Sequence, residues 1–206
     1  MDRKILHEQL TKTSRTVPLV GRLDGELYAT GRDAFLNLAS QSEEPIKILF
    51  DSVGGDSFLS LQLGDLMRIL PCKFIGVVLE ASSAACTILQ FCNQRLAVQS
   101  GRFLIHKNTC TPDDKILRFR DDELFGQKME KVLQNLRSLD SRLVELFIYR
   151  TGFSEDEVKK WFSASDDFLS SFGVQEALRR KLIDDIVADD FRLFPTGKPP
   201  ETSKMP

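Results

Sequence analysis

Apolar and polar residues alternate in blocks along the first hundred positions, and the block lengths predict an α/β fold. Short, continuously apolar runs typical of buried strands occur at 17–21, 46–50, 74–79, 95–98 and 102–106. Apolar residues at helical spacing predict helices over 31–41, 56–70 and 82–92. Asp56 or Ser57 is the expected N-cap of the second helix, and Pro71 ends it. The order of these elements predicts a repeating unit of two strands and a helix.

A long amphipathic pattern dominates the second half of the chain. From about 114 to 150, apolar residues recur at steps of three and four with charges between them, which predicts one long helix. Because so long an apolar stripe needs a partner surface, the helix is expected either to protrude and pack on another copy or to fold back onto its own core. Further on, Ser154 and Glu157 form a capping box that opens a short helix. A last helix and strand are predicted at 174–182 and 183–187.

Length, charge and cysteine usage narrow the class of protein. The 206 residues suit a single domain over 1–190, with a Pro-rich tail at 191–206 that is expected to be disordered. A net charge of −2 with scattered basic residues argues against binding to nucleic acid. No signal peptide and no membrane-spanning apolar run is recognisable, which predicts a cytoplasmic protein without membrane contact. The four cysteines lack metal-ligand spacing, so we expect buried thiols and neither a metal nor another cofactor.

Three motifs carry the candidate chemistry: FDSVGGD at 50–56, ASSAA at 81–85 and FLIH at 103–106. Gly54 and Gly55 follow a strand, and their missing Cβ atoms allow backbone N–H groups to approach a ligand carbonyl, although they can also be simple turn residues. Ser82 or Ser83 places a hydroxyl at the start of an apolar helix, where a serine can also serve only as an N-cap. His106, one of only two histidines, ends a strand before a polar loop and is the candidate base.

Six short blocks in a fixed order connect the chain to a known family. They are DSVGG at 51–55, ASSAA at 81–85, RFLIH at 102–106, TG at 151–152, DDFLS at 166–170 and QEALRRKLIDDI at 175–186. Together they resemble the proteolytic subunit of the Clp protease, a serine peptidase, over about residues 15–188. The resemblance implies an α/β, crotonase-like fold of repeated ββα units with a long protruding helix.

The resemblance also implies roles for individual residues. Position by position, Ser83 matches the nucleophile, His106 the general base, and Asp166 the residue that orients the imidazole. Gly55 and Ala84 match the positions whose backbone N–H groups hold the oxyanion. A triad beside an oxyanion hole is therefore expected.

Neighbouring residues leave two assignments open. Ser82 is an alternative nucleophile to Ser83, and Asp167 is an alternative to Asp166, which without the resemblance reads as a surface charge. The segment KNTCTPDD, which follows His106, replaces a glycine-rich stretch of the family that helps to bind extended peptide. The resemblance therefore does not carry peptide binding by strand addition over to this segment.

The expected function is that of an ATP-dependent Clp-type serine endopeptidase subunit, which cleaves peptides or unfolded polypeptides through an acyl-enzyme. The resemblance implies a homo-oligomeric ring and an AAA+ ATPase unfoldase as partner. One alternative is a catalytically inactive Clp-like subunit of a mixed ring. Another is a crotonase-type acyl-CoA enzyme, in which two backbone amides polarise a thioester and no serine is needed.

Overall fold

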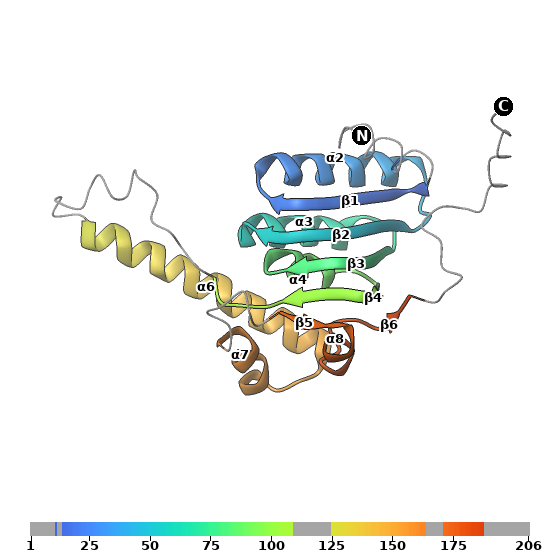
Figure 1. Cartoon of the computed structure of the whole chain (residues 1–206). Coiled ribbons are helices and arrows are strands. Elements are labelled where there is room, and N and C mark those ends of the chain that lie inside the picture. The colour runs from blue at the N-terminus through green and yellow to red at the C-terminus, as the bar shows by residue number, and fades with distance from the viewer. Residues whose placement is uncertain (1–10, 12–13, 109–124, 164–170, 188–206) are drawn as a thin grey trace, which may run out of the picture.

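A computed structural model describes residues 11, 14–108, 125–163 and 171–187. Strands and helices alternate through its first part: β1 (Thr16–Leu23), α2 (Gly25–Gln41), β2 (Ile46–Gly55), α3 (Ser57–Ile69), β3 (Phe74–Ser82), α4 (Ala84–Leu89) and β4 (Gln94–Leu104). β1 to β4 form a parallel sheet in chain order, with β5 (Phe172–Gly173) antiparallel and β6 (Asp185–Ile186) parallel to β4. The predicted α/β class is confirmed, and all four parallel strands point their carboxyl ends towards α6 (Phe125–Thr151) (Figure 1).

Aspartate caps fix where the first two helices begin. The Asp24 carboxylate accepts hydrogen bonds from the backbone N–H groups of Glu26 and Leu27, both at 3.0 Å, so α2 starts six residues before the predicted 31. Asp56 caps α3 in the same way, as predicted. α4 is shorter than the predicted 82–92 at both ends: the chain turns at Ser83 and does not become helical until Ala84, and the helix ends at Leu89.

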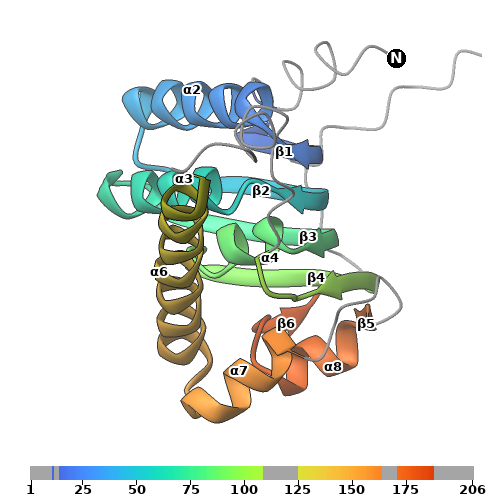
Figure 2. The same ribbon diagram turned by 90° about the vertical axis from the view of Figure 1, so that its left-hand side faces the viewer.

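The main core lies between the sheet and the helices α2, α3 and α4, which cover one of its faces (Figure 2). Alternate residues of β2 account for this arrangement: Ile48 and Phe50 are fully buried, whereas Asp51 is exposed on the other side. Phe35 of α2 meets Phe74 of β3 edge to face, with ring centroids 5.0 Å apart. This contact holds the start of β3 against α2, at the end of the strand opposite to the candidate motifs.

A row of register irregularities crosses the sheet. Val20 pairs with Asp51, Asp51 with Glu80, and Glu80 with Arg102, and each neighbouring pair of strands shifts register beside this row. Such irregularities bend a strand and increase its twist. The row therefore divides the strands into a longer part against the helices and a short part that leads to the candidate site.

The largest irregularity corrects one prediction. The strands predicted at 95–98 and 102–106 are a single strand, β4, which ends at Leu104. Val78 of β3 pairs with Ala97 of β4, and Glu80 pairs with Arg102, so that β4 runs through five residues where β3 runs through two. The polar QSG segment is absorbed as an irregularity within β4 and does not end the strand.

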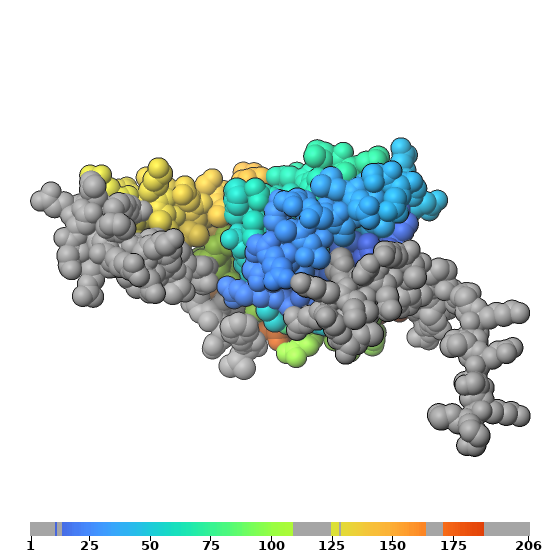
Figure 3. Space-filling view, turned by 90° about the horizontal axis from the view of Figure 1, so that it is seen from above, coloured from blue at the N-terminus to red at the C-terminus, as the bar shows by residue number. Residues whose placement is uncertain are grey.

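The long helix α6 both protrudes and folds back. Its C-terminal half is buried against the body through Leu143, Val144, Leu146 and Phe147. Its N-terminal half, which includes the half-exposed Leu133, extends beyond α2 and α3 (Figure 3). The predicted start at about 114 lies outside the described residues.

The C-terminal elements complete the described structure. Gly152, at φ +73°, follows the last residue of α6, and α7 (Glu155–Ser163) and α8 (Val174–Arg179) come next. The predicted capping box is confirmed: Ser154 N donates to Glu157 Oε2 (3.1 Å), and Glu157 N donates to Ser154 Oγ (3.4 Å). The tail at 191–206 lies outside the described residues.

Candidate functional site

Ser83 occupies a sharp turn between β3 and α4. Its φ of 54° and ψ of −119° are a backbone conformation that costs about 1–3 kcal/mol for a residue with a side chain. The turn is held because Ser83 N donates to Leu104 O of β4 (2.7 Å) and the last strand residue, Ser82, is buried. The Ser82 hydroxyl donates to Glu80 Oε1 (3.2 Å), whereas Ser83 is partly exposed. The geometry thus presents the second serine of the motif to solvent.

The two glycines at the end of β2 have different neighbours: Gly54 packs against this turn and Gly55 against β1. Gly54 has φ +85°, and a Cβ there would lie 2.4 Å from Ser82 O and 2.7 Å from Ser83 Cβ. Gly55 has φ +151°, and a Cβ there would lie 2.2 Å from Leu23 O of β1. Both positions therefore require glycine, and Gly54 brings the backbone of β2 as close to the serine turn as the chain permits.

His106 follows β4 and is partly exposed. Its Nδ1 lies 2.6 Å from Lys107 O. Since a carbonyl oxygen only accepts, this contact favours the tautomer that carries its proton on Nδ1. Nε2 is then an acceptor, which is the form a general base requires.

Two cavities meet at Ser83 and His106. A groove of about 550 Å³ is lined by both residues together with Gly55 and by Leu136 and Leu139 of α6. A second, narrow cavity of about 10 Å³ is lined by both residues and by apolar side chains. Four residues face both cavities, namely Ser57, Ser83, His106 and Asn108.

A polar chain that the motifs did not reveal links the loop after His106 to α6. The Ser57 hydroxyl donates to Asn108 Oδ1 in a very short contact. Asn108 in turn donates to Asp140 Oδ1 from Nδ2 (2.8 Å) and from its backbone N (3.3 Å). One signal in the sequence pointed to Asp140: it is an acid on the apolar stripe of the long helix, four residues after Leu136 and three before Leu143.

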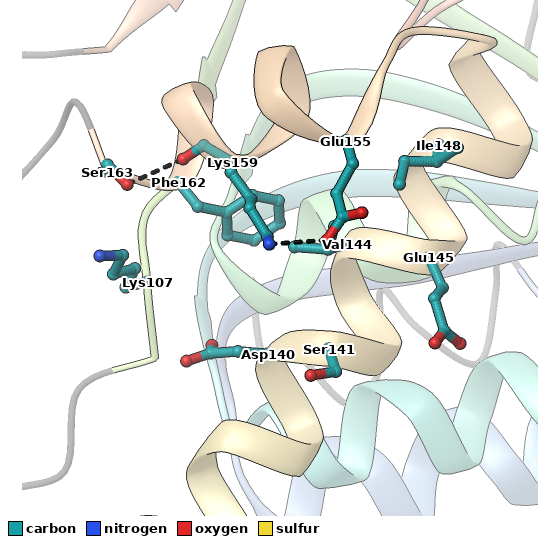
Figure 4. Close-up of a pocket in the computed structure, with 10 residues that line it drawn as sticks. All are labelled: Lys107, Asp140, Ser141, Val144, Glu145, Ile148, Glu155, Lys159, Phe162 and Ser163. Atoms are coloured by element: carbon teal, nitrogen blue, oxygen red, sulfur yellow. Dashed lines mark hydrogen bonds and ion pairs between the residues drawn. The ribbon is translucent and has the colours of Figure 1, made fainter.

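A third cavity lies next to Asp140, between α6 and α7. It has a volume of about 420 Å³ and is lined by Lys107, Asp140, Val144 and Phe162 among others (Figure 4). At its edge Lys159 Nζ pairs with Glu155 Oε1 at 2.6 Å. The Asp140 carboxylate points from α6 towards the segment that carries Lys107 (Figure 4).

The structure brings four of the expected site residues together. Ser83, Ala84 and His106 line the narrow cavity, and Gly55 joins Ser83 and His106 at the groove. Ala84 is the first residue of α4, where helix N–H groups have no partner within the helix. Asp166 and its alternative Asp167 lie outside the described residues.

The three cysteines that the structure describes are not candidates for the chemistry. Cys72, Cys86 and Cys92 are buried, as predicted, and Cys110 lies outside the described residues. Burial raises the pKa of the Cys86 thiol to about 12, so it carries no nucleophilic thiolate near neutral pH although it is close to Ser83 in sequence. Among the described residues, no group of three potential ligands could hold a metal ion. In the same part of the chain, no helix is both long and apolar enough to span a bilayer.

Comparison with known proteins gives the family. The profile of the Clp protease family matches residues 4–190. The chain belongs to the Clp protease family. Its fold is similar to that of a point mutant of ClpP1 from Listeria monocytogenes, with a TM-score of 0.74, 22% sequence identity, and coverage of 90% of this chain and 97% of that chain. The predicted Clp resemblance and crotonase-like fold are thereby confirmed.

Proposed function

We propose that this member of the Clp protease family is a serine endopeptidase subunit that cleaves peptides and unfolded polypeptides through an acyl-enzyme. The observation that carries the proposal is the turn at Ser83, which places this partly exposed serine beside the two cavities that His106 also lines. A strained strand-to-helix turn is also how other hydrolases expose a nucleophilic serine. The strained backbone of Ser83 costs free energy, and packing alone does not explain why the fold keeps it, whereas presentation of a nucleophile would.

The reaction would proceed in two balanced halves. Ser83 Oγ attacks the substrate carbonyl carbon while Nε2 of His106 takes the hydroxyl proton. The C–N bond then breaks, and the imidazolium returns the proton to the departing amine. Water next attacks the ester with His106 again as base, which releases the carboxylic acid and restores the serine.

Charge on the carbonyl oxygen would be held by the backbone N–H groups of Gly55 and Ala84. Each such donor typically lowers the barrier by about 3–4 kcal/mol in a preorganised site. The close contact of Gly54 with the serine turn supports this assignment, since it fixes the backbone that leads into Gly55 relative to Ser83.

We assign Asp166 to the stabilisation of the imidazolium, with Asp167 as the alternative. In the described arrangement Nδ1 of His106 faces Lys107 O, which fixes the tautomer but adds no negative charge. A carboxylate that replaced or joined this carbonyl would stabilise the protonated ring more strongly. Exchange of Asp166 and, separately, of Asp167 for asparagine tells the two apart, because only the functional carboxylate should change the rate strongly.

A cytoplasmic homo-oligomeric ring, served by an AAA+ ATPase unfoldase, is the assembly we propose. Family membership supports the ring and the peptide substrates. The protruding half of α6, which carries the half-exposed Leu133, is where we expect another copy to pack.

Labelling with a fluorophosphonate tests the proposal on the assembled protein. The probe should modify Ser83, and Ser83→Ala should abolish both labelling and peptide hydrolysis. Ser82→Ala is the matched control, because the neighbouring hydroxyl is buried against Glu80 and should not be needed. An unlabelled Ser83, together with unchanged hydrolysis by Ser83→Ala, would overturn the proposal.

A further inference from the structure

The narrow cavity beside Ser83 has walls that cannot easily move. Its apolar lining includes Ile105, Leu143, Phe147 and Phe162, each at most 6% exposed. Phe147 and Phe162 meet edge to face with centroids 5.3 Å apart. Enlarging the cavity on this side would require repacking of the core between α6 and α7.

Asn108 is one of the polar residues that line the same cavity, and the orientation of its side chain is fixed from two sides. The amide oxygen accepts from Ser57 at the start of α3, and the amide nitrogen donates to Asp140 of α6. The backbone N–H of Asn108 also donates to Asp140. Because both ends of the amide are engaged, Asn108 cannot swing out of the cavity without losing these bonds.

We infer that the substrate lies in the groove with the side chain of the residue whose carbonyl is attacked in this narrow cavity, and that Asn108, held by Asp140, restricts that side chain to a small one such as that of alanine or glycine. The inference rests on the proposed function and names a substrate class for it. The cavity of about 10 Å³ adjoins Ser83 and His106 and has roughly the space of one water molecule. A methyl group is of that size, whereas a leucine or phenylalanine side chain is several times larger.

The polar chain also explains why an acid lies on the inward stripe of α6. Asp140 reaches neither Ser83 nor His106 in a described bond, so it acts through Asn108 as a positioning residue. If Asp140 is lost, Asn108 keeps only its contact with Ser57 and is free to turn towards the groove. Loss of either residue should therefore widen the range of accepted side chains.

The test uses fluorogenic peptides that differ only in alanine, leucine or phenylalanine at the residue before the cleaved bond. For the assembled wild type we expect kcat/KM at least tenfold higher with alanine than with leucine. Asn108→Ala should lower this alanine-to-leucine ratio at least tenfold, and Asp140→Ala should lower it in the same direction. Asp140→Asn keeps an acceptor oxygen and should restore the narrow preference. Glu145→Ala, an exposed carboxylate on the same helix, is the matched control and should keep the wild-type ratio.

Two results would overturn the inference while leaving the proposed function intact: wild type that cleaves leucine and alanine substrates equally, or an unchanged ratio in Asn108→Ala. Fluorophosphonate labelling of Ser83, measured in parallel, separates this failure from that of the enzyme itself. If Ser83 is unlabelled and no peptide is cleaved, the proposed function fails and the inference fails with it. Asn108→Ser serves as a second opening variant if Asn108→Ala does not assemble.

Discussion

Replacement of Gly54 by alanine should damage the site far more than its small change in volume suggests. The new Cβ would lie 2.4 Å from Ser82 O, which is about 1 Å closer than ordinary contact begins, and 2.7 Å from Ser83 Cβ. Both atoms belong to the turn that presents the candidate nucleophile, so the turn has to move. Left-handed strain adds to this overlap, because the φ of Gly54 is +85°.

The expected magnitude follows from these two contributions. Left-handed backbone costs an alanine about 1–2 kcal/mol, and overpacking costs typically another 1–3 kcal/mol, so we expect a destabilisation of about 2–5 kcal/mol. A displacement of the turn by about 1 Å should reduce peptide hydrolysis by about 100-fold. Urea unfolding followed by circular dichroism and by the fluorescence of Trp161, the single tryptophan, measures the first effect.

Gly152→Ala is the matched control. Gly152 has a similar φ of +73°, but a Cβ there would meet no atom within 4 Å. The control should therefore show the strain alone, about 1–2 kcal/mol, with hydrolysis close to that of the wild type. The reasoning is refuted if Gly54→Ala matches Gly152→Ala in both stability and rate.

Three further outcomes concern stability and reactivity. Asp184→Ala should cost about 2–3 kcal/mol in urea unfolding, because it leaves the buried Arg95 without its ion-pair partner. Burial alone would raise the pKa of Asp184, but the hydrogen bonds and charge of Arg95 lower it below its usual value. The difference in unfolding free energy between wild type and Asp184→Ala should therefore be full at neutral pH and shrink as the pH falls below about 4. A constant difference down to pH 2 would contradict this expectation. Ser154→Ala should cost about 1 kcal/mol in the same assay through loss of the capping box with Glu157, and no change in midpoint would count against that role. Mass spectrometry should find Cys86 unmodified by a thiol reagent at pH 8 in folded protein but modified in urea, since burial raises the pKa of its thiol to about 12. Rapid labelling of Cys86 in the folded protein would show that the thiol is not buried.

Periodicity was enough to predict the strands and helices that make the core. Each of β1, β2 and β3 contains its predicted apolar run, because these runs are buried in the sheet. The ends of elements were harder to predict, since they depend on single contacts. α2 began early because Asp24 caps it, and β4 stayed whole because a register irregularity absorbed QSG. Neither a capping residue nor a register irregularity produces a periodic pattern of apolar residues, so periodicity could not predict either one.

The candidate site could likewise be predicted only in part: residues in local motifs were found, and residues joined by a long-range contact were missed. Gly55, Ser83, Ala84 and His106 were found from short motifs, and each lies beside a cavity at the ends of adjacent strands. Asn108 and Asp140 were missed because their partnership spans 32 residues and joins a loop to a helix. A contact of this kind follows from how α6 crosses the strand ends and not from any local pattern.

The row of shifted register from Val20 to Arg102 also determines how an insertion or deletion would reach the site. Beyond it, β3 and β4 stay paired up to Ser82 and Leu104, shortly before Ser83 and His106, whereas Gly55 pairs with Leu23 of β1. The relative position of Ser83 and His106 therefore depends on how many residues β4 inserts at the row. A deletion within QSG would move His106 relative to Ser83, while the longer strand segments on the other side of the row kept their register.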